Sequence, residues 1–102
     1  MEVHYANKRI ESFVTSVEEQ HQDIVVQMIR LLAYQGSKLR MPYSRALGRG
    51  LFELRILNPI QVRIFYTFYA GEAWLLHGFI KKQQQTPIRE IKYARKILRS
   101  LA

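Results

Sequence analysis

Three short runs decide the fold: LFELRIL at 51–57, VRIFYTFY at 62–69 and AWLLHGFI at 73–80. Each run is rich in the branched and aromatic residues that favour strands, and turn-forming residues around Asn58-Pro59 and Gly71 separate the runs. Connections of so few residues leave no room for a crossover helix. The runs therefore predict three antiparallel strands that follow one another in sequence order.

The segment before these runs has the periodicity of helices. A short strand is expected at Val3–Tyr5, where apolar and polar residues alternate. Apolar residues then follow the i, i+3, i+4, i+7 spacing after Asn7, a residue type that often caps a helix. The four residues from Ser16 match a capping box, which predicts a second helix reaching about Tyr34 and stopped by Gly36. Two helices that meet at a cap predict a helical hairpin.

Two further segments complete the expected order of elements. Residues 37–50 read as a basic connection that contains no acidic residue. Thr86, as an N-cap, followed by Pro87 predicts a final helix that reaches about Leu101. The predicted fold class is α+β: a single domain over residues 1–102, with an N-terminal helical hairpin packed on a twisted antiparallel sheet and a helix at the C-terminus.

Charge is unevenly distributed along the 102 residues, whose formal net charge is +8. Residues 1–35 carry three basic and five acidic side chains, whereas residues 36–102 carry thirteen basic and three acidic ones. Such a field favours a polyanionic partner, with nucleic acid ahead of a membrane surface. The absence of cysteine excludes a disulfide scaffold and a thiolate metal site, and it suits the reducing cytoplasm.

Other classes are disfavoured by the pattern of apolar residues and histidines. The first ten residues lack the apolar core of a signal peptide, and the longest apolar stretch is too short to cross a bilayer. The three histidines are scattered singly and form no metal-binding motif. We therefore expect no membrane partner, no metal and no cofactor.

Alternation along the strands separates two faces of the predicted sheet. One face is almost wholly apolar, as expected beneath the helices, and Tyr66 falls on it. In the third run, simple alternation places Leu75 on the same face as His77. The other face mixes charges and aromatic rings: Glu53, Arg55, Arg63, Phe65, His77 and Phe79. It is either a solvated surface with ordinary ion pairs or a phosphate-binding surface whose rings stack on unpaired bases.

Two more groups of basic residues have the same two interpretations. On the final helix, five basic residues fall within an arc of about 120° at 100° per residue. They are Arg89, Lys92, Arg95, Lys96 and Arg99. The pair Lys81-Lys82 follows the third strand run. Each group is either a solvated surface or part of a surface that binds nucleic acid or a protein partner.

Four motifs in order resemble one known family: LGxGLFELR at 47–55, VRIFY at 62–66, LLHGFIKK at 75–82 and TPxxEI at 86–91. They resemble the HigB-like branch of the RelE superfamily, the toxins of type II toxin–antitoxin pairs. The resemblance implies a RelE-like α+β fold and a metal-independent endoribonuclease that cleaves mRNA, usually on the ribosome. It also implies inhibition by a cognate helix-turn-helix antitoxin, HigA-like in this branch.

The resemblance also implies roles for particular residues. RNA supplies its own nucleophile, the 2′-hydroxyl, so cleavage needs a base, cations for the phosphate and an acid for the leaving oxygen. Glu53 is expected to orient Arg55 or to act as a base. Gln83–Gln85 stand where relatives often carry another cation. The expected catalytic residues are Arg55, Arg63, Lys81 and Glu53, and the expected RNA-binding residues are Lys82, Phe65, Phe79, His77 and Arg49.

Two other functions stay open on the residues alone. A non-catalytic nucleic-acid-binding or regulatory module with the same fold would bind RNA or DNA in a salt-sensitive way without cleaving it. A structural partner subunit would have no affinity for RNA, and its basic surfaces would meet an acidic protein.

Overall fold

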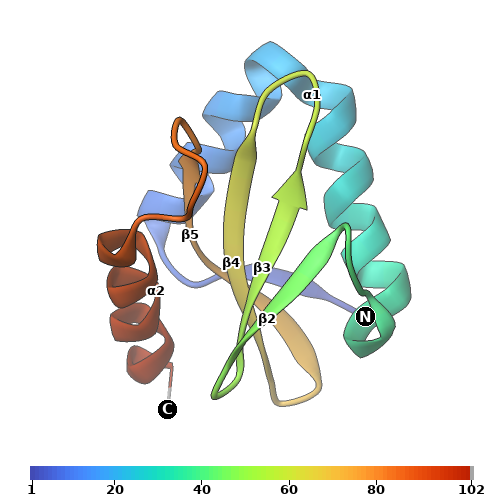
Figure 1. Cartoon of the computed structure of the whole chain (residues 1–102). Coiled ribbons are helices and arrows are strands. Elements are labelled where there is room, and N and C mark those ends of the chain that lie inside the picture. The colour runs from blue at the N-terminus through green and yellow to red at the C-terminus, as the bar shows by residue number, and fades with distance from the viewer. Residues whose placement is uncertain (102) are drawn as a thin grey trace.

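The computed structural model describes residues 1–101, apart from the side chain of Gln22, as a five-stranded sheet with a helix on each face (Figure 1). The strand order in the sheet is β1-β5-β4-β3-β2. The predicted α+β class is confirmed. The elements are β1 (Val3–Tyr5), α1 (Lys8–Gln35), the 3-10 turn η1 (Gly36–Lys38), β2 (Ser44–Gly48), β3 (Leu51–Ile56), β4 (Val62–Tyr69), β5 (Glu72–Ile80) and α2 (Ile88–Ser100).

Strands β3, β4 and β5 form the predicted antiparallel meander, in which Arg55 lies directly opposite Arg63. The short first strand is confirmed as well, but it makes the sheet mixed instead of wholly antiparallel. Strand β1 pairs in parallel with β5, with Val3 opposite Ala73. A parallel neighbour is possible here because the chain between these two strands is long enough to return to the same end of the sheet.

The basic connection predicted at 37–50 contains an additional strand, β2, which pairs antiparallel with β3. Arg45 of β2 lies opposite Glu53. Alternation did not reveal this strand, because it lies at the edge of the sheet and its side chains are mostly exposed. The tight turn into β3 passes through Gly48 and Gly50, whose positive φ angles of 89° and 81° suit glycine.

Helix α1 consists of two helical arms, as predicted, but they meet at a different residue and without the predicted cap. Its start is confirmed, since the Asn7 side chain accepts a hydrogen bond from the backbone N–H of Ile10 at 3.1 Å. Its end is confirmed as well, since Gly36 has a φ of 55° and donates to the Leu32 carbonyl. The break lies at His21, with φ −139° and ψ 49°, and not at the capping box predicted from Ser16. Ser16 continues the helix, and the two arms of α1 arch over the sheet (Figure 1).

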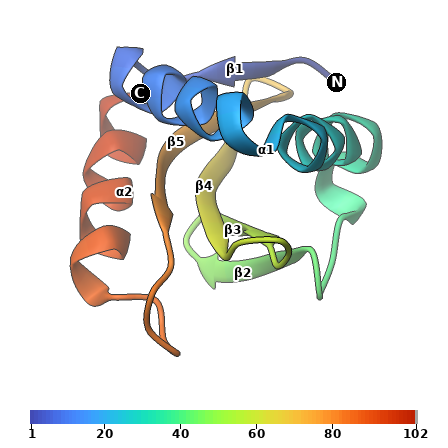
Figure 2. The same ribbon diagram turned by 90° about the horizontal axis from the view of Figure 1, so that it is seen from above.

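The core is divided between the two faces of the sheet. Helix α1 covers one face with residues such as Val14 and Leu32, which are fully buried against β3, β4 and β5. Helix α2 covers part of the other face, where Ala94 packs against Phe65 and Leu76 (Figure 2). The face of the sheet that was predicted to be exposed, which carries Phe65, is therefore half covered by α2.

A β-bulge in β5 corrects the simple alternation predicted for that strand. The register with β4 changes from Phe65 opposite His77 to Tyr66 opposite Leu75, which leaves Leu76 as an extra residue. Leu75 consequently joins the core beneath α1, whereas Leu76 joins the core beneath α2. The prediction that Leu75 shares a face with His77 was wrong, because a bulge reverses the alternation that follows it.

The final helix is confirmed to within one residue at each end, but its predicted cap is wrong. The N-cap of α2 is Pro87, and no side chain caps the helix. The hydroxyl of Thr86 instead donates a hydrogen bond to Oε2 of Glu53 at 2.7 Å. Thr86 therefore fastens the loop before α2 to the sheet.

Candidate functional site

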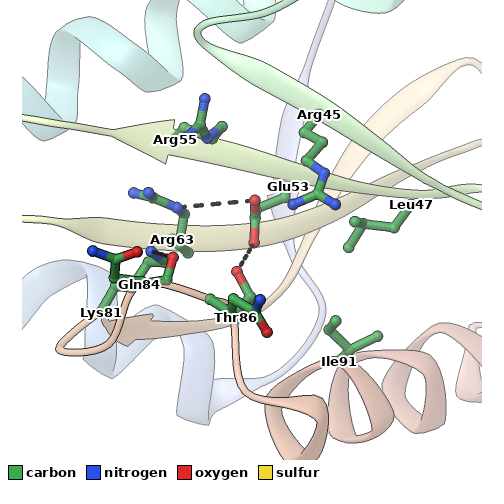
Figure 3. Close-up of a pocket in the computed structure, with 10 residues that line it drawn as sticks. Arg45, Leu47, Glu53, Arg55, Arg63, Lys81, Gln84, Thr86 and Ile91 are labelled. Carbon is green, nitrogen blue, oxygen red and sulfur yellow. Dashed lines mark hydrogen bonds and ion pairs between the residues drawn. The ribbon is translucent and has the colours of Figure 1, made fainter.

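The uncovered part of the second face forms a pocket of about 480 Å³ between β2, the loop before α2 and the first turn of α2 (Figure 3). Four adjacent strands each bring one cation to it, on the strand itself or directly after its end. These cations are Arg45, Arg55, Arg63 and Lys81. Among the described residues that line the pocket, Glu53 is the one carboxylate. The pocket is therefore a strongly cationic surface around a single negative group.

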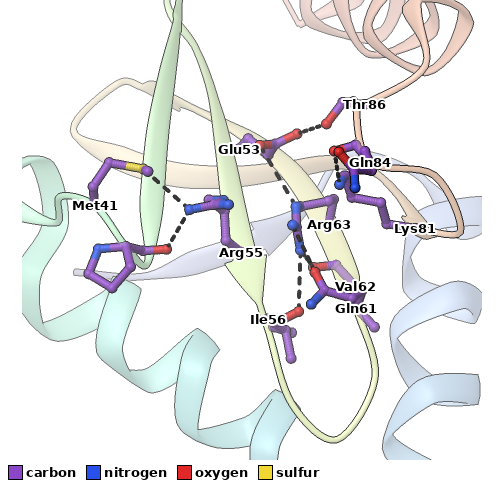
Figure 4. A network of polar contacts seen from close by, with 11 residues as sticks. Met41, Glu53, Arg55, Ile56, Gln61, Val62, Arg63, Lys81, Gln84 and Thr86 are labelled. Atoms are coloured by element: carbon purple, nitrogen blue, oxygen red, sulfur yellow. Dashed lines mark hydrogen bonds and ion pairs between the residues drawn. The ribbon is translucent and has the colours of Figure 1, made fainter.

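Arg63 is held rigidly in the floor of this pocket, with only 2% of its side chain exposed. Its Nη1 donates to the carbonyls of Ile56 at 3.3 Å and Val62 at 3.1 Å, and its Nη2 donates to Oε1 of Gln61 at 2.9 Å (Figure 4). Its Nε has no hydrogen-bond partner among the described residues and lies 3.9 Å from Oε1 of Glu53. The guanidinium is a fixed buried cation.

The pKa of Arg63 is shifted by its surroundings. Burial lowers the pKa of Arg63, and the neighbouring charge of Arg55 lowers it further, whereas the Glu53 carboxylate opposes both effects. Arginine nevertheless stays charged in proteins. Arg63 therefore supplies a permanent positive field beneath the pocket.

Glu53 links the floor of the pocket to its rim. Its side chain is 1% exposed, Oε2 accepts the hydrogen bond from Thr86, and Oε1 faces Arg63. Within residues 1–101, Oε1 accepts no hydrogen bond. Thr86 was missed as a site residue, because a threonine before a proline at the start of a helix is typical of a cap.

Arg55 and Lys81 are the more accessible of the predicted catalytic cations, since both are partly exposed whereas Arg63 is buried. Arg55 donates through Nη1 to the Pro42 carbonyl at 3.2 Å and contacts Sδ of Met41 at 3.5 Å. Lys81 donates through Nζ to the Gln84 carbonyl. Both cations bind acceptors on surface loops, so each can exchange that acceptor for a phosphate oxygen.

Arg45 and two glutamines, Gln84 and Gln85, line the pocket although the sequence did not predict them as site residues. Arg45 is exposed and points into the pocket from β2 (Figure 3). It was missed because the strand that carries it was missed. Gln84 and Gln85 line the pocket where another cation was expected by resemblance.

The residues predicted to bind RNA bases lie outside the pocket. Phe65 is fully buried beneath α2 and offers no face to a base, so its predicted stacking role is corrected. His77 is also buried, and its Nε2 lies 2.7 Å from Oε1 of Glu90 on α2. Phe79 stacks on Phe65 with ring centroids 5.9 Å apart. These rings pack beneath α2, because the helix covers the half of the sheet that carries them.

The two remaining cations predicted to bind RNA are exposed but separate from the pocket. Lys82 lies beside a smaller depression next to Phe79 and Pro87. Arg49 lies in the turn between β2 and β3, near the far end of α2. The pocket thus unites the four predicted catalytic residues and none of the five predicted RNA-binding residues.

One cluster elsewhere has the donor types of a metal site. Ligand atoms of Glu2, His4 and Glu72 all lie within 4.8 Å of one another. The cluster is at the start of β5, whereas Lys81 follows the end of that strand. His4 and Glu72 already form a pair with each other, with 2.8 Å between Nε2 and Oε1.

Within residues 1–101, no helix is both long and apolar enough to cross a membrane.

An α+β fold with this topology is compatible with the class of small toxin proteins. The family model described as "Phage derived protein Gp49-like (DUF891)" matches residues 12–99, and the chain belongs to this family. The matched segment includes every residue that lines the pocket. The family is part of the RelE/ParE toxin-like superfamily, so the chain is a toxin-type module with a cognate antitoxin as its partner. A search of curated proteins gave no match.

Proposed function

We propose that this chain is a single-domain, HigB-like toxin with a RelE-type fold that cleaves mRNA in the cytoplasm, in association with the ribosome and without a metal. The observation that carries the proposal is the pocket in which four cations surround one carboxylate. RNA cleavage places negative charge on a phosphate, and preorganised cations stabilise that charge more than they stabilise the substrate.

The charged residues of the pocket have different roles in this reaction. The RNA 2′-hydroxyl attacks the adjacent phosphorus, the bond from phosphorus to the 5′-oxygen breaks, and the products are a cyclic phosphate and a 5′-hydroxyl. Oε1 of Glu53 is the group that takes the proton of the 2′-hydroxyl, and the Lys81 ammonium gives a proton to the leaving oxygen. Arg45 and Arg55 contact the phosphate, while Arg63 acts from beneath through its fixed charge.

Expression of the chain alone tests the proposal. We expect growth to stop and mRNA to fragment. We also expect purified protein that has been stripped of metal to cleave mRNA on intact ribosomes, in a buffer whose only divalent ion is the Mg²⁺ that ribosomes need, at a rate that added Zn²⁺ or Mn²⁺ does not change. An Arg55→Ala/Lys81→Ala double variant removes two partly exposed cations and should relieve both effects. The matched control is Arg30→Ala/Lys38→Ala, which removes two exposed cations outside the pocket. Soluble, folded protein that leaves mRNA intact, free and on ribosomes, would contradict the proposal.

We further propose that the cognate antitoxin is a helix-turn-helix protein of the HigA type. Co-expression of a small helix-turn-helix protein encoded next to the toxin should restore growth, and the two proteins should copurify. Failure of every neighbouring gene product to do so would contradict this part of the proposal.

The second candidate is a non-catalytic RNA-binding module, favoured by the burial of Arg63 and its three hydrogen bonds to protein acceptors. It predicts salt-sensitive RNA binding with no cleavage under any of the conditions above. Detection of RNA fragments with cyclic phosphate ends would exclude it.

A further inference from the structure

A second cationic surface adjoins the pocket along the seam between β2 and α2. Arg95 of α2 closes this seam by donating to the carbonyls of Leu47 at 3.0 Å and Gly48 at 3.1 Å. On one side of the closure, Leu47 and Ile91 line the pocket. On the other side, Arg95 lines a smaller cavity of about 190 Å³ together with Arg49, Leu98 and Arg99. The two cavities are therefore neighbours along the same seam.

Among residues 1–101, the cations of the outer cavity have no charge partner. Arg49 and Arg99 are both exposed, and within residues 1–101 neither forms an ion pair or a side-chain hydrogen bond. The other exposed basic residues of α2 continue the positive surface. In the described part of the chain, the one ion pair that they form joins Arg89 to Glu90 at 3.7 Å. Arg49 lies between the two turn glycines and has a φ of 52°, a value that is uncommon for a residue other than glycine.

The seam has the length and the mixed surface that a single RNA strand needs. From Ile91 to Arg99, α2 rises by roughly 12 Å at 1.5 Å per residue, which is the length of a few nucleotides. Apolar side chains, Leu47 and Leu98 among them, lie between the cations and offer surfaces for sugars and bases. Alternating cations and apolar surface is the arrangement that proteins use to bind single strands.

We propose that this seam is a second RNA-binding surface, which holds the phosphate backbone of the strand as it leaves the pocket. Arg49 and Arg99 make the contacts, and Arg95 keeps β2 and α2 at the spacing that the strand requires. The inference rests on the proposed function, because it takes the pocket as the place where the strand is cut. It adds a binding surface for nucleotides beyond the scissile phosphate.

The test compares two RNA probes whose 2′-hydroxyls are O-methylated, so that neither can be cleaved. One is a long single strand and the other a trinucleotide that fills only the pocket. For Arg49→Gln/Arg99→Gln we expect about tenfold weaker binding of the long probe, and a salt dependence shallower by about 1.4 for two lost phosphate contacts. Binding of the trinucleotide should not change.

The matched control is Arg30→Gln/Lys38→Gln, which removes the same charge from exposed positions outside the seam. Equal urea midpoints establish that both variants are folded. The inference is overturned if the seam variant binds the long probe as tightly as the wild type, or if the control weakens binding equally. Cleavage of an unmodified long strand is measured in parallel. A wild type that binds the long probe but never cleaves RNA would overturn the proposed function and leave the seam standing.

Discussion

Replacing Glu53 by glutamine would remove the counter-ion of a buried arginine while keeping the volume of the side chain. Glu53 is 1% exposed and Arg63 is 2% exposed, with 3.9 Å between Oε1 and Nε. Unit charges about 4 Å apart attract by about 4 kcal/mol at an effective dielectric constant of 20. Removing one partner of a buried pair typically costs about 3–5 kcal/mol. The glutamine oxygen still accepts from Thr86, so we expect Glu53→Gln to lower the free energy of unfolding by about 3 kcal/mol.

Urea unfolding of a double-mutant cycle measures this interaction. With a denaturant dependence of about 2 kcal/mol per molar urea for a domain of this size, the midpoint should fall by about 1.5 M. Arg63→Met should be destabilised as well, because Glu53 then lacks its cation. The double variant should lose less than the sum of the two, with a coupling energy of about 2–3 kcal/mol.

The refuting result is additivity. If the two losses add to within about 0.5 kcal/mol, Glu53 and Arg63 do not act as a pair. The control is Glu2→Gln, which neutralises an exposed carboxylate directly before β1. It should change the free energy of unfolding by less than about 0.5 kcal/mol.

Three further changes test other features of the structure. Thr86→Val should slow RNA cleavage about tenfold with an unchanged KM, because the Glu53 carboxylate loses the hydroxyl that orients it; single-turnover kinetics measure this. Gly78→Ala should destabilise the fold by about 2 kcal/mol in urea unfolding, because the new Cβ would lie 2.5 Å from the ring of Phe13. Tyr66→Phe should flatten the loss of stability above pH 10: burial raises the pKa of Tyr66, so the folded state keeps a proton that the unfolded state releases, and stability falls as pH rises through that range.

Each of these changes has its own control. Thr86→Ser keeps the hydroxyl and should cleave at nearly the wild-type rate, whereas equal losses in both variants would contradict the positioning role. Gly71→Ala meets no atom within 4 Å, so it reports only the cost of its φ of 78°. Equal pH profiles for Tyr66→Phe and the wild type in alkaline urea unfolding would show that another group titrates.

The sequence predicts the centre of this sheet well because local rules decide it. Short connections between the three β-rich runs allow only an antiparallel meander, which puts Arg55 and Arg63 on adjacent strands. The register that sets them directly opposite each other was not predicted and comes from the structure. The strand β2 obeys no such rule, since an edge strand is stabilised by pairing with its neighbour and its side chains need not be apolar. Missing β2 meant missing Arg45.

The sequence predicted most of the charged residues that gather at the candidate site, but not which of them are buried. Residues Glu53 and Arg63 lie on the expected face, yet the pairing that buries them depends on the loop that brings Thr86 over the sheet. The covering of Phe65 depends on where α2 packs. No periodicity in the helix specifies the half of the sheet that it covers, so Phe65 was expected to be open. The bulge at Leu76 likewise arises from packing on both faces of the sheet.

The parallel pairing of β1 with β5 also sets an order of folding during synthesis, because β1 is made long before its partner strand. Val3 can pair only after Ala73 has been made, and the residues that line the pocket extend from Arg45 to Ile91. Contacts so distant in sequence form late, because the intervening chain must be ordered first. An unfinished chain holds the cations of β2 and β3 without the loop or helix that shapes their pocket. A toxin built in this way gains its site only after every segment from β2 to α2 has been made.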